Sequence, residues 1–236
     1  MTTPAHYHEL YEIYFLLEGS CDYFIGSRTY HLTAGDLVLI PEGVIHNTVY
    51  HSTGNSRLLI NCASRYVPAS ARPKGYIYRN AALTEKLREF LEAAEAEYNA
   101  ADRFSEEAVS CHIRLLFFLL ARNPNQYDAA GTENGAVSRA AAWLQLHFTE
   151  DVTLPELAEI AAVSPEHLSR LFRKETGFGF REYRSLLRLQ RAEQLLKQRS
   201  GASVAEIAAE CGFSDSNYFS VAFKKVYGFS PKQVQR

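Results

Sequence analysis

The spacing of apolar residues changes part-way along this chain of 236 residues, and this change constrains the fold more than any other feature. From about Tyr11 to Cys62, short apolar or alternating runs are separated by turn residues, which is the pattern of β-strands. From Leu83 onward, apolar residues recur three and four positions apart, which is the pattern of amphipathic helices. We therefore expect a β-rich half followed by a helical half.

Composition and charge exclude several classes of protein. With 47% hydrophobic and 22% charged residues the chain has globular composition, and no apolar run approaches the ~20 residues that span a bilayer. The first residues lack the basic and apolar regions of a secretory signal. The cysteines have no paired spacing, so we expect reduced thiols in a cytoplasmic protein.

The two halves also differ in charge. Residues 1–136 hold 11 Lys and Arg against 16 Asp and Glu, whereas residues 137–236 hold 14 against 11. A mildly basic second half is compatible with binding to nucleic acid.

The first half contains several predicted strands, at residues 13–17, 22–25, 28–32, 37–40 and 58–60. Gly26-Ser27 separates the second strand from the third and is a signal for a two-residue hairpin, because glycine supplies the positive φ of that turn. Repeated short strands at this spacing predict a sandwich or a small barrel.

Two helices are predicted after the strands, the first beginning near Leu83 and the second covering residues 105–121. Ser105 is the expected N-cap of the second helix. The end of that helix is apolar almost all round, so it is either fully buried or in contact with a second subunit. The polar, turn-rich stretch that follows is expected to be a linker.

A short pattern occurs twice in the second half. Residues 157–164 resemble residues 206–214, and each segment precedes an apolar-periodic stretch that ends in Phe and basic residues. Two helix-turn-helix units joined by a helix over residues 181–197 would explain this repeat. Ser164 would cap the second helix of the first unit, and Ser214 or Asp215 that of the second. An ordinary helical bundle is the alternative.

Longer segments of this half carry a family resemblance. They are residues 168–177 (LSRLFRKETG), 188–196 (RLQRAEQLL), 207–219 (IAAECGFSDSNYF), 223–225 (FKK) and 228–231 (GFSP). Through them, residues 137–236 resemble the DNA-binding domain of the AraC/XylS family of bacterial transcription regulators. Val221 departs from the family pattern, because relatives often have a polar residue there.

The resemblance implies which side chains meet DNA. The groove-facing positions are Glu166, His167, Ser169 and Arg170 in the first unit and Ser216, Asn217, Ser220 and Val221 in the second. Arginine suits guanine and asparagine suits adenine. The residues implied to contact phosphates, which position the protein without reading sequence, are Arg173, Lys174, Lys224 and Lys225.

The β-rich half resembles the cupins. His6, His8 and Glu12 have the spacing HxHx3E, and Gly35, Pro41, Gly43 and His46 resemble the second cupin motif, although Tyr50 stands where that motif ends in Asn. In cupins the matching residues sit on adjacent strands of a small barrel and point inward. Three imidazoles and one carboxylate suit a divalent transition metal, and they could equally contact an effector or serve as scaffold.

Together these observations predict a fold and its domains. We expect a cupin or jelly-roll barrel that senses an effector (residues 1–78), dimerisation helices (79–122), a linker (123–136) and an all-α DNA-binding domain (137–236). That domain would hold two helix-turn-helix units, at about 154–175 and 204–226, joined by a long helix.

The expected function is sequence-specific regulation of transcription by a homodimer, controlled by a small effector such as a sugar. Family resemblance implies RNA polymerase as a further partner. A metal-dependent cupin enzyme with a helical appendage is the main alternative, and a helical interaction module that does not bind DNA is another. Because no general base or substrate clamp accompanies the four cupin positions, we predict that the chain is not an enzyme.

Overall fold

The computed structural model describes residues 10–51, 54–72, 76–123, 135–199 and 201–235. The chain divides into two compact units, one up to residue 133 and one from residue 134 onward. In the part of the chain that is described, no helix has the length and apolar character needed to span a membrane.

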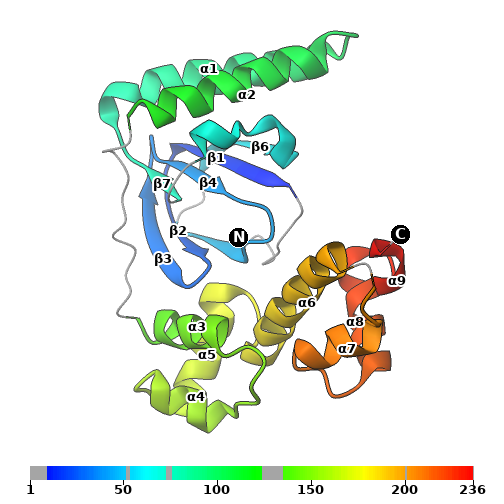
Figure 1. Ribbon diagram of the computed structural model, residues 1–236. Coiled ribbons are helices and arrows are strands. Elements are labelled where there is room, and N and C mark those ends of the chain that lie inside the picture. The colour runs from blue at the N-terminus through cyan, green and yellow to red at the C-terminus, as the bar shows by residue number, and fades with distance from the viewer. Residues whose placement is uncertain (1–9, 52–53, 73–75, 124–134, 200, 236) are drawn as a thin grey trace. The chain divides into compact units, whose positions relative to one another are not determined.

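The first unit is built on two antiparallel sheets (Figure 1). One sheet has the strand order β6-β1-β4-β7 and contains β1 (Tyr11–Glu18), β4 (Leu37–Ile40), β6 (Ser56–Cys62) and β7 (Ile77–Tyr78). The other has the order β3-β2-β5 and contains β2 (Ser20–Ile25), β3 (Arg28–Thr33) and β5 (His46–Tyr50). All the predicted strands are present, whereas β5 and β7 were not predicted from the sequence.

The predicted hairpin joins β2 to β3. Ile25 pairs with Arg28, which leaves a two-residue loop, and Gly26 has a φ of +63°. This left-handed conformation is unfavourable for a residue with a Cβ, so glycine sets the register of the hairpin.

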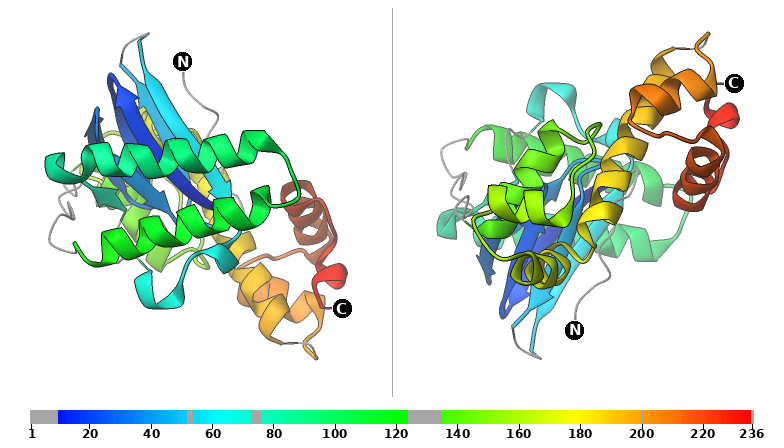
Figure 2. Two further views of the ribbon diagram at one scale, coloured as in Figure 1. Left: turned by 90° about the horizontal axis from the view of Figure 1, so that it is seen from above. Right: turned by 90° about the horizontal axis from the view of Figure 1, so that it is seen from below.

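Alternation along β1 divides the core of this unit into two layers. Tyr14 and Leu16 face the three-stranded sheet, where they pack with Tyr23 and Leu32. Residues on the opposite face of the four-stranded sheet pack against α1 (Ala81–Ala100) and α2 (Ser105–Ala121), which run side by side across it (Figure 2). The short helices η1 (Ser64–Tyr66) and η2 (Ala69–Ala71) follow β6.

Helix α2 spans the predicted residues but has a different N-cap. Phe104, not Ser105, is its N-cap residue, and the Ser105 hydroxyl accepts a hydrogen bond from the Asp102 backbone N–H at 2.9 Å. Among the residues that the structure describes, this helix is not buried on all sides, because Leu116 is buried while Leu115 is 51% exposed.

The second unit is helical. Its elements are α3 (Ala136–Leu146), α4 (Leu154–Ile160), α5 (Pro165–Thr176), α6 (Phe180–Gln198), α7 (Val204–Glu210), α8 (Ser216–Tyr227) and α9 (Pro231–Val234). Helix α6 connects the α4–α5 pair to the α7–α8 pair (Figure 1). One face of α6 is apolar and buried, and it includes Tyr183, Leu189 and Leu196.

Candidate functional site

The two helix pairs of the second unit have the same local geometry. Capping boxes formed by Thr153 with Glu156 and by Ser203 with Glu206 start α4 and α7. Both turns then close with a backbone bond that spans five residues, from Val163 N–H to the Ala158 carbonyl at 3.0 Å and from Phe213 N–H to the Ala208 carbonyl at 2.9 Å. The sequence repeat therefore corresponds to a repeated structural unit.

The hydrogen bonds of the capping boxes also affect acidity. The backbone N–H and the hydroxyl of Thr153 lower the pKa of Glu156, and those of Ser203 lower the pKa of Glu206 in the same way. Both helix starts thus carry an ionised carboxylate at the positive end of the helix dipole.

The second helix of each pair is capped differently. Ser164 accepts from the His167 N–H at 3.2 Å and caps α5, as predicted. In the other pair Asp215 is the cap, and its carboxylate accepts from the N–H groups of Asn217 at 2.7 Å and Tyr218 at 3.3 Å. The second turn is consequently one residue longer than the first.

An arginine from the preceding helix holds each turn. Arg139 on α3 donates to the Ala161 carbonyl, with its Nε at 3.2 Å and its Nη2 at 2.5 Å. Arg188 on α6 donates to the Gly212 carbonyl at 2.6 Å. It also donates to the Phe148 carbonyl at 2.6 Å. Arg188 was not singled out from the sequence, because on an amphipathic helix it looks like one more exposed charge.

The turn at Gly212 requires glycine for two reasons. Its φ is +86°, and a Cβ added there would lie 2.7 Å from the Thr149 carbonyl oxygen. The equivalent Ala162 adopts a φ of +54°. Ala162 is exposed, whereas a Cβ at Gly212 would meet the loop that follows α3.

Helices α5 and α8 each bury one face and expose the other. Leu168 and Phe172 on α5 are buried, as are Phe219 and Phe223 on α8. The predicted base-reading residues lie on the uncovered parts: Glu166, Ser169, Arg170, Asn217 and Val221 are exposed, and His167, Ser216 and Ser220 are half-buried.

Local contacts order some of these side chains. Arg170 Nη2 lies 3.2 Å from His167 Nδ1, and the Ser220 hydroxyl donates to the Ser216 carbonyl at 2.8 Å. Val221 is 69% exposed and Tyr218, which was not predicted to contact DNA, is 61% exposed. Apolar side chains this exposed on a helix are candidates for contact with a partner.

The predicted phosphate-contacting residues differ in their surroundings. Lys174, Lys224 and Lys225 are exposed in the last turns of α5 and α8. Arg173 is exposed too, but its Nη2 lies 3.1 Å from Glu182 Oε2 in an ion pair. A phosphate contact by Arg173 would have to compete with Glu182.

Two of the predicted cupin positions meet in the interior of the first unit. Glu12 on β1 and His46 on β5 are both buried, with Glu12 Oε2 3.6 Å from His46 Nε2. We expected adjacent strands, and this was wrong: β1 and β5 belong to different sheets, so the two side chains approach each other across the interior. His6 and His8 lie outside the described residues.

Neighbouring groups orient this pair. The Tyr23 hydroxyl donates to Glu12 Oε1 at 2.5 Å, and His46 Nδ1 lies 2.8 Å from the Val44 carbonyl oxygen. Because a carbonyl only accepts, Nδ1 carries a proton and Nε2 is turned toward Glu12. Burial and the adjacent carboxylate raise the pKa of Tyr23, which keeps its hydroxyl a donor.

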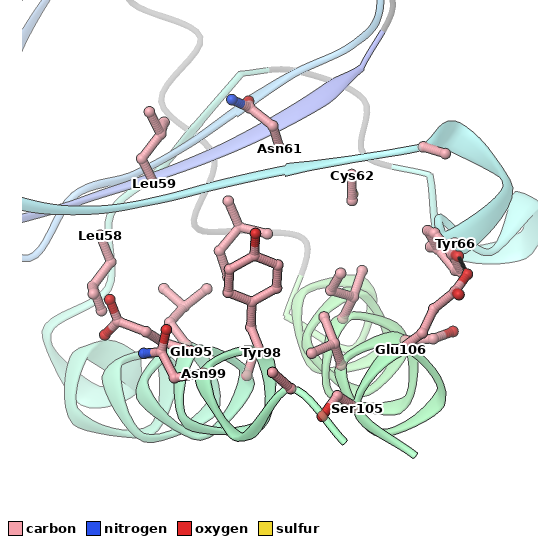
Figure 3. Close-up of a pocket in the computed structure, with 18 of the residues that line it drawn as sticks. Leu58, Leu59, Asn61, Cys62, Tyr66, Glu95, Tyr98, Asn99, Ser105 and Glu106 are labelled. Atoms are coloured by element: carbon pink, nitrogen blue, oxygen red, sulfur yellow. Dashed lines mark hydrogen bonds between the residues drawn. The ribbon is translucent and has the colours of Figure 1, made fainter. Parts of the chain in front are cut away.

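A pocket of about 1050 Å³ lies elsewhere in the unit, between β6 and the α1–α2 pair (Figure 3). Leu58 and Cys62 line it from the strand, and Tyr98, Glu95 and Val109 from the helices. At one end, Tyr66 donates a hydrogen bond to Glu106. Sequence patterns did not predict this pocket, because it depends on how the helices pair over an edge strand.

Comparison with known proteins accounts for both units. The sequence model of the AraC-like ligand binding domain matches residues 2–117, and that of a helix-turn-helix domain matches residues 157–236. The chain belongs to the AraC family of transcription regulators. It is therefore a DNA-binding regulator with a ligand-binding N-terminal domain.

Relatives of the chain are HTH-type transcriptional activators. The HTH-type transcriptional activator RhaS of Pectobacterium carotovorum is 28% identical, over 98% of this chain and 87% of the relative. RhaS of Escherichia coli is 27% identical, over 99% and 87%. Among solved structures, the C-terminal domain of the response regulator AraT from Geobacillus stearothermophilus is 39% identical over 43% of this chain and 84% of that one, with a TM-score of 0.40.

Proposed function

We propose that this AraC-family regulator activates transcription by placing α5 and α8 in two successive major-groove segments of one DNA site. The observation that carries the proposal is that the helix pair occurs twice. In each copy an arginine of the preceding helix donates to a carbonyl of the turn. Each pair then acts as a helix-turn-helix unit whose second helix enters the groove. Helix α6, with 19 residues, sets their separation.

The proposed base contacts follow from exposure and chemistry. Arg170 on α5 suits guanine and Asn217 on α8 suits adenine, and both are exposed. Glu166, His167, Ser169, Ser216 and Ser220 complete the polar set. Val221, together with Tyr218, offers apolar surface that suits the methyl group of thymine.

Phosphate contacts would hold the protein in register. Lys174, Lys224 and Lys225 are the best placed, because they are exposed and no ion pair engages them among the described residues. Arg173 would contribute less, since Glu182 neutralises part of its charge.

Control by a small molecule is assigned to the first unit. The two sheets would form a jelly-roll barrel of the cupin type, and Glu12 and His46 would contact the effector or, with His6 and His8, hold a divalent transition metal. The Val44 carbonyl on Nδ1 supports ligand binding at His46 Nε2, because it fixes the ring in the orientation that a metal-ligating histidine needs. The pocket beside β6 is a second candidate for the effector, favoured by its volume.

The α1–α2 pair is the proposed dimer interface. Leu115 is 51% exposed, and Phe118 and Leu119 beside it are only partly buried. A second subunit would cover this surface.

We assign residues 1–78 to sensing, 79–122 to dimerisation, 123–136 to the linker and 137–236 to DNA binding. RNA polymerase is the expected partner at the promoter, in the cytoplasm, and we assign no catalysis to the chain.

Selection of bound sequences from a random DNA pool tests the proposal. The wild type should enrich a site with two subsites about one helical turn apart. The Arg170→Ala variant should lose base preference at the subsite read by α5 and retain it at the subsite read by α8. The Asn217→Ala variant should lose preference at the α8 subsite and retain it at the α5 subsite. Enrichment of one short subsite by all three proteins would contradict reading by both pairs. A thermal-shift screen of metabolites, including sugars, then identifies the effector. Loss of the shift in His46→Ala would place the effector at the interior pair, and loss in Tyr98→Ala would place it in the pocket beside β6.

A further inference from the structure

The outer face of the three-stranded sheet carries a histidine and aspartate group to which the proposed function assigns no role. Asp22 on the central strand β2 pairs directly with His31 on β3, and His51 follows the last residue of β5. Side chains alternate along a strand, and the neighbours Cys21 and Leu32 are fully buried on the inner face. Asp22, His31 and His51 consequently share the solvent side.

The three side chains converge. Asp22 Oδ1 lies 2.9 Å from His31 Nδ1, and Asp22 Oδ2 lies 2.9 Å from His51 Nε2. All three potential ligand atoms lie within 4.8 Å of one another. The imidazole rings stack with centroids 5.9 Å apart and planes 30° apart, and each ring directs a nitrogen toward the carboxylate.

We propose that Asp22, His31 and His51 form a binding site for a divalent transition metal, with Zn²⁺ as the best match. Two imidazole nitrogens and one carboxylate oxygen are a ligand set that zinc accepts, with water at the remaining position. Imidazole nitrogen selects such ions over Mg²⁺ and Ca²⁺, which prefer oxygen. The metal would take the place of the hydrogen bonds that now join the rings to Asp22, and each neutral imidazole would carry its single proton on the ring nitrogen that faces away from the metal.

The position of His31 is prepared for this role. Arg79 donates to the His31 carbonyl and also to Asp36, with Nε 3.0 Å from Oδ1 and 3.1 Å from Oδ2. This anchors β3 at the histidine, and the pairing of β3 with β2 fixes its distance from Asp22. Less ordering is then required when the metal binds.

This site is distinct from the pair in the interior. Glu12 and His46 are buried beside Tyr23, whereas the metal site begins at Asp22, the preceding residue, whose side chain points the opposite way. Within the described ranges, Asp22, His31 and His51 are also the one group of three His, Cys, Asp or Glu side chains close enough to share an ion. His147 and Glu150, 2.8 Å apart, form only a pair and serve as a comparison.

Titration of the full-length protein with Zn²⁺, and with Co²⁺ as a spectroscopic probe, tests the site. The wild type should bind one more equivalent than His31→Ala, His51→Ala or the nearly isosteric Asp22→Asn, or bind it at least about tenfold more tightly. Ligand-field bands of Co²⁺ should be lost in the same variants. Equal unfolding midpoints without metal establish that the variants fold.

Two further variants make the result specific. His147→Ala should bind as the wild type does, because a single pair holds metal weakly. His46→Ala should also retain this equivalent. Binding that is lost in His46→Ala and kept in His31→Ala would place the metal in the interior and overturn the proposal. Equal stoichiometry and affinity in the wild type, His31→Ala and His51→Ala would overturn it as well.

Discussion

Arg188 on α6 donates a hydrogen bond of 2.6 Å to the carbonyl oxygen of Gly212, in the turn between α7 and α8. The same guanidinium group reaches the carbonyls of Phe148, Thr149 and Glu150, in the loop after α3. One buried side chain thus joins the helix between the two pairs to segments on both sides of it. In the proposed complex, the arrangement of α5 and α8 on DNA would depend on this junction.

Replacing Arg188 by Ala should destabilise the second unit by about 3 kcal/mol or more, because several buried carbonyls lose their donor. The stability of the Arg188→Lys variant should lie between those of the wild type and Arg188→Ala, since one ammonium cannot reproduce the fork of the guanidinium. Urea unfolding followed by Trp143, the one tryptophan of the chain, reports on this unit. Arg191→Ala, at an exposed position of the same helix, is the control, and an equal loss in both variants would refute the role of Arg188.

Base and phosphate contacts should respond differently to mutation. Arg170→Ala and Asn217→Ala should each weaken specific binding by ~1–3 kcal/mol and relax preference in different subsites. Lys224→Ala should weaken all sequences alike and reduce the salt dependence by roughly one unit of slope. Salt-dependent fluorescence anisotropy distinguishes these effects, with Lys197→Ala on α6 as the control. Uniform weakening by Arg170→Ala would reassign that residue to phosphate.

The proposed dimer interface can be tested at adjacent leucines of α2. Leu115→Glu should yield folded monomers, because Leu115 is 51% exposed on the uncovered face. Leu116→Glu should instead unfold the first unit, since Leu116 is 1% exposed in the core. Sedimentation velocity and circular dichroism separate these outcomes. A monomeric wild type, or a dimeric Leu115→Glu variant, would exclude this interface.

The thiols should differ in reactivity. Burial raises the pKa of Cys21, Cys62 and Cys211 to about 11, while Cys111 is exposed. At pH 8 a thiol reagent should therefore modify about one cysteine per native chain, and Cys111→Ser should abolish that reaction. Because folding raises these pKa values, the stability they contribute is present below pH 9 and is lost as the pH rises toward 11. Rapid modification of all four cysteines in the native protein would contradict this burial.

Sequence reasoning found the elements whose apolar periodicity is strong. Helices α2 and α6 and the hairpin at Gly26 appeared where they were predicted. Strand β5 was not predicted because it begins with three polar residues that are nevertheless buried, His46, Asn47 and Thr48. The predicted Ser105 cap failed because Ser105 lies one residue inside the helix and bonds Asp102 instead.

Contacts that depend on tertiary structure could not be predicted in this way. Nothing in the spacing of Asp22, His31 and His51 is typical of a metal site, because the register of three strands brings them together. The role of Arg188 could not be predicted either, since its carbonyl partners lie 24 to 40 positions away in the sequence. The positions proposed to read DNA came from family resemblance, and they stay predictions.

The spacing between the two subsites tests the central claim most directly. Helix α6 has 19 residues and is ~28 Å long at ~1.5 Å per residue, and successive major-groove segments on one face are ~34 Å apart. With the widths of the helix pairs added, α6 can place α5 and α8 in adjacent segments. We would measure affinity for a selected site before and after insertion of about 5 base pairs, half a helical turn, between its subsites. A site with an altered spacer sequence of the original length is the control. The insertion should reduce affinity to that of a single subsite, because the second groove then lies on the far face of the DNA. Unchanged affinity would contradict tandem reading by α5 and α8.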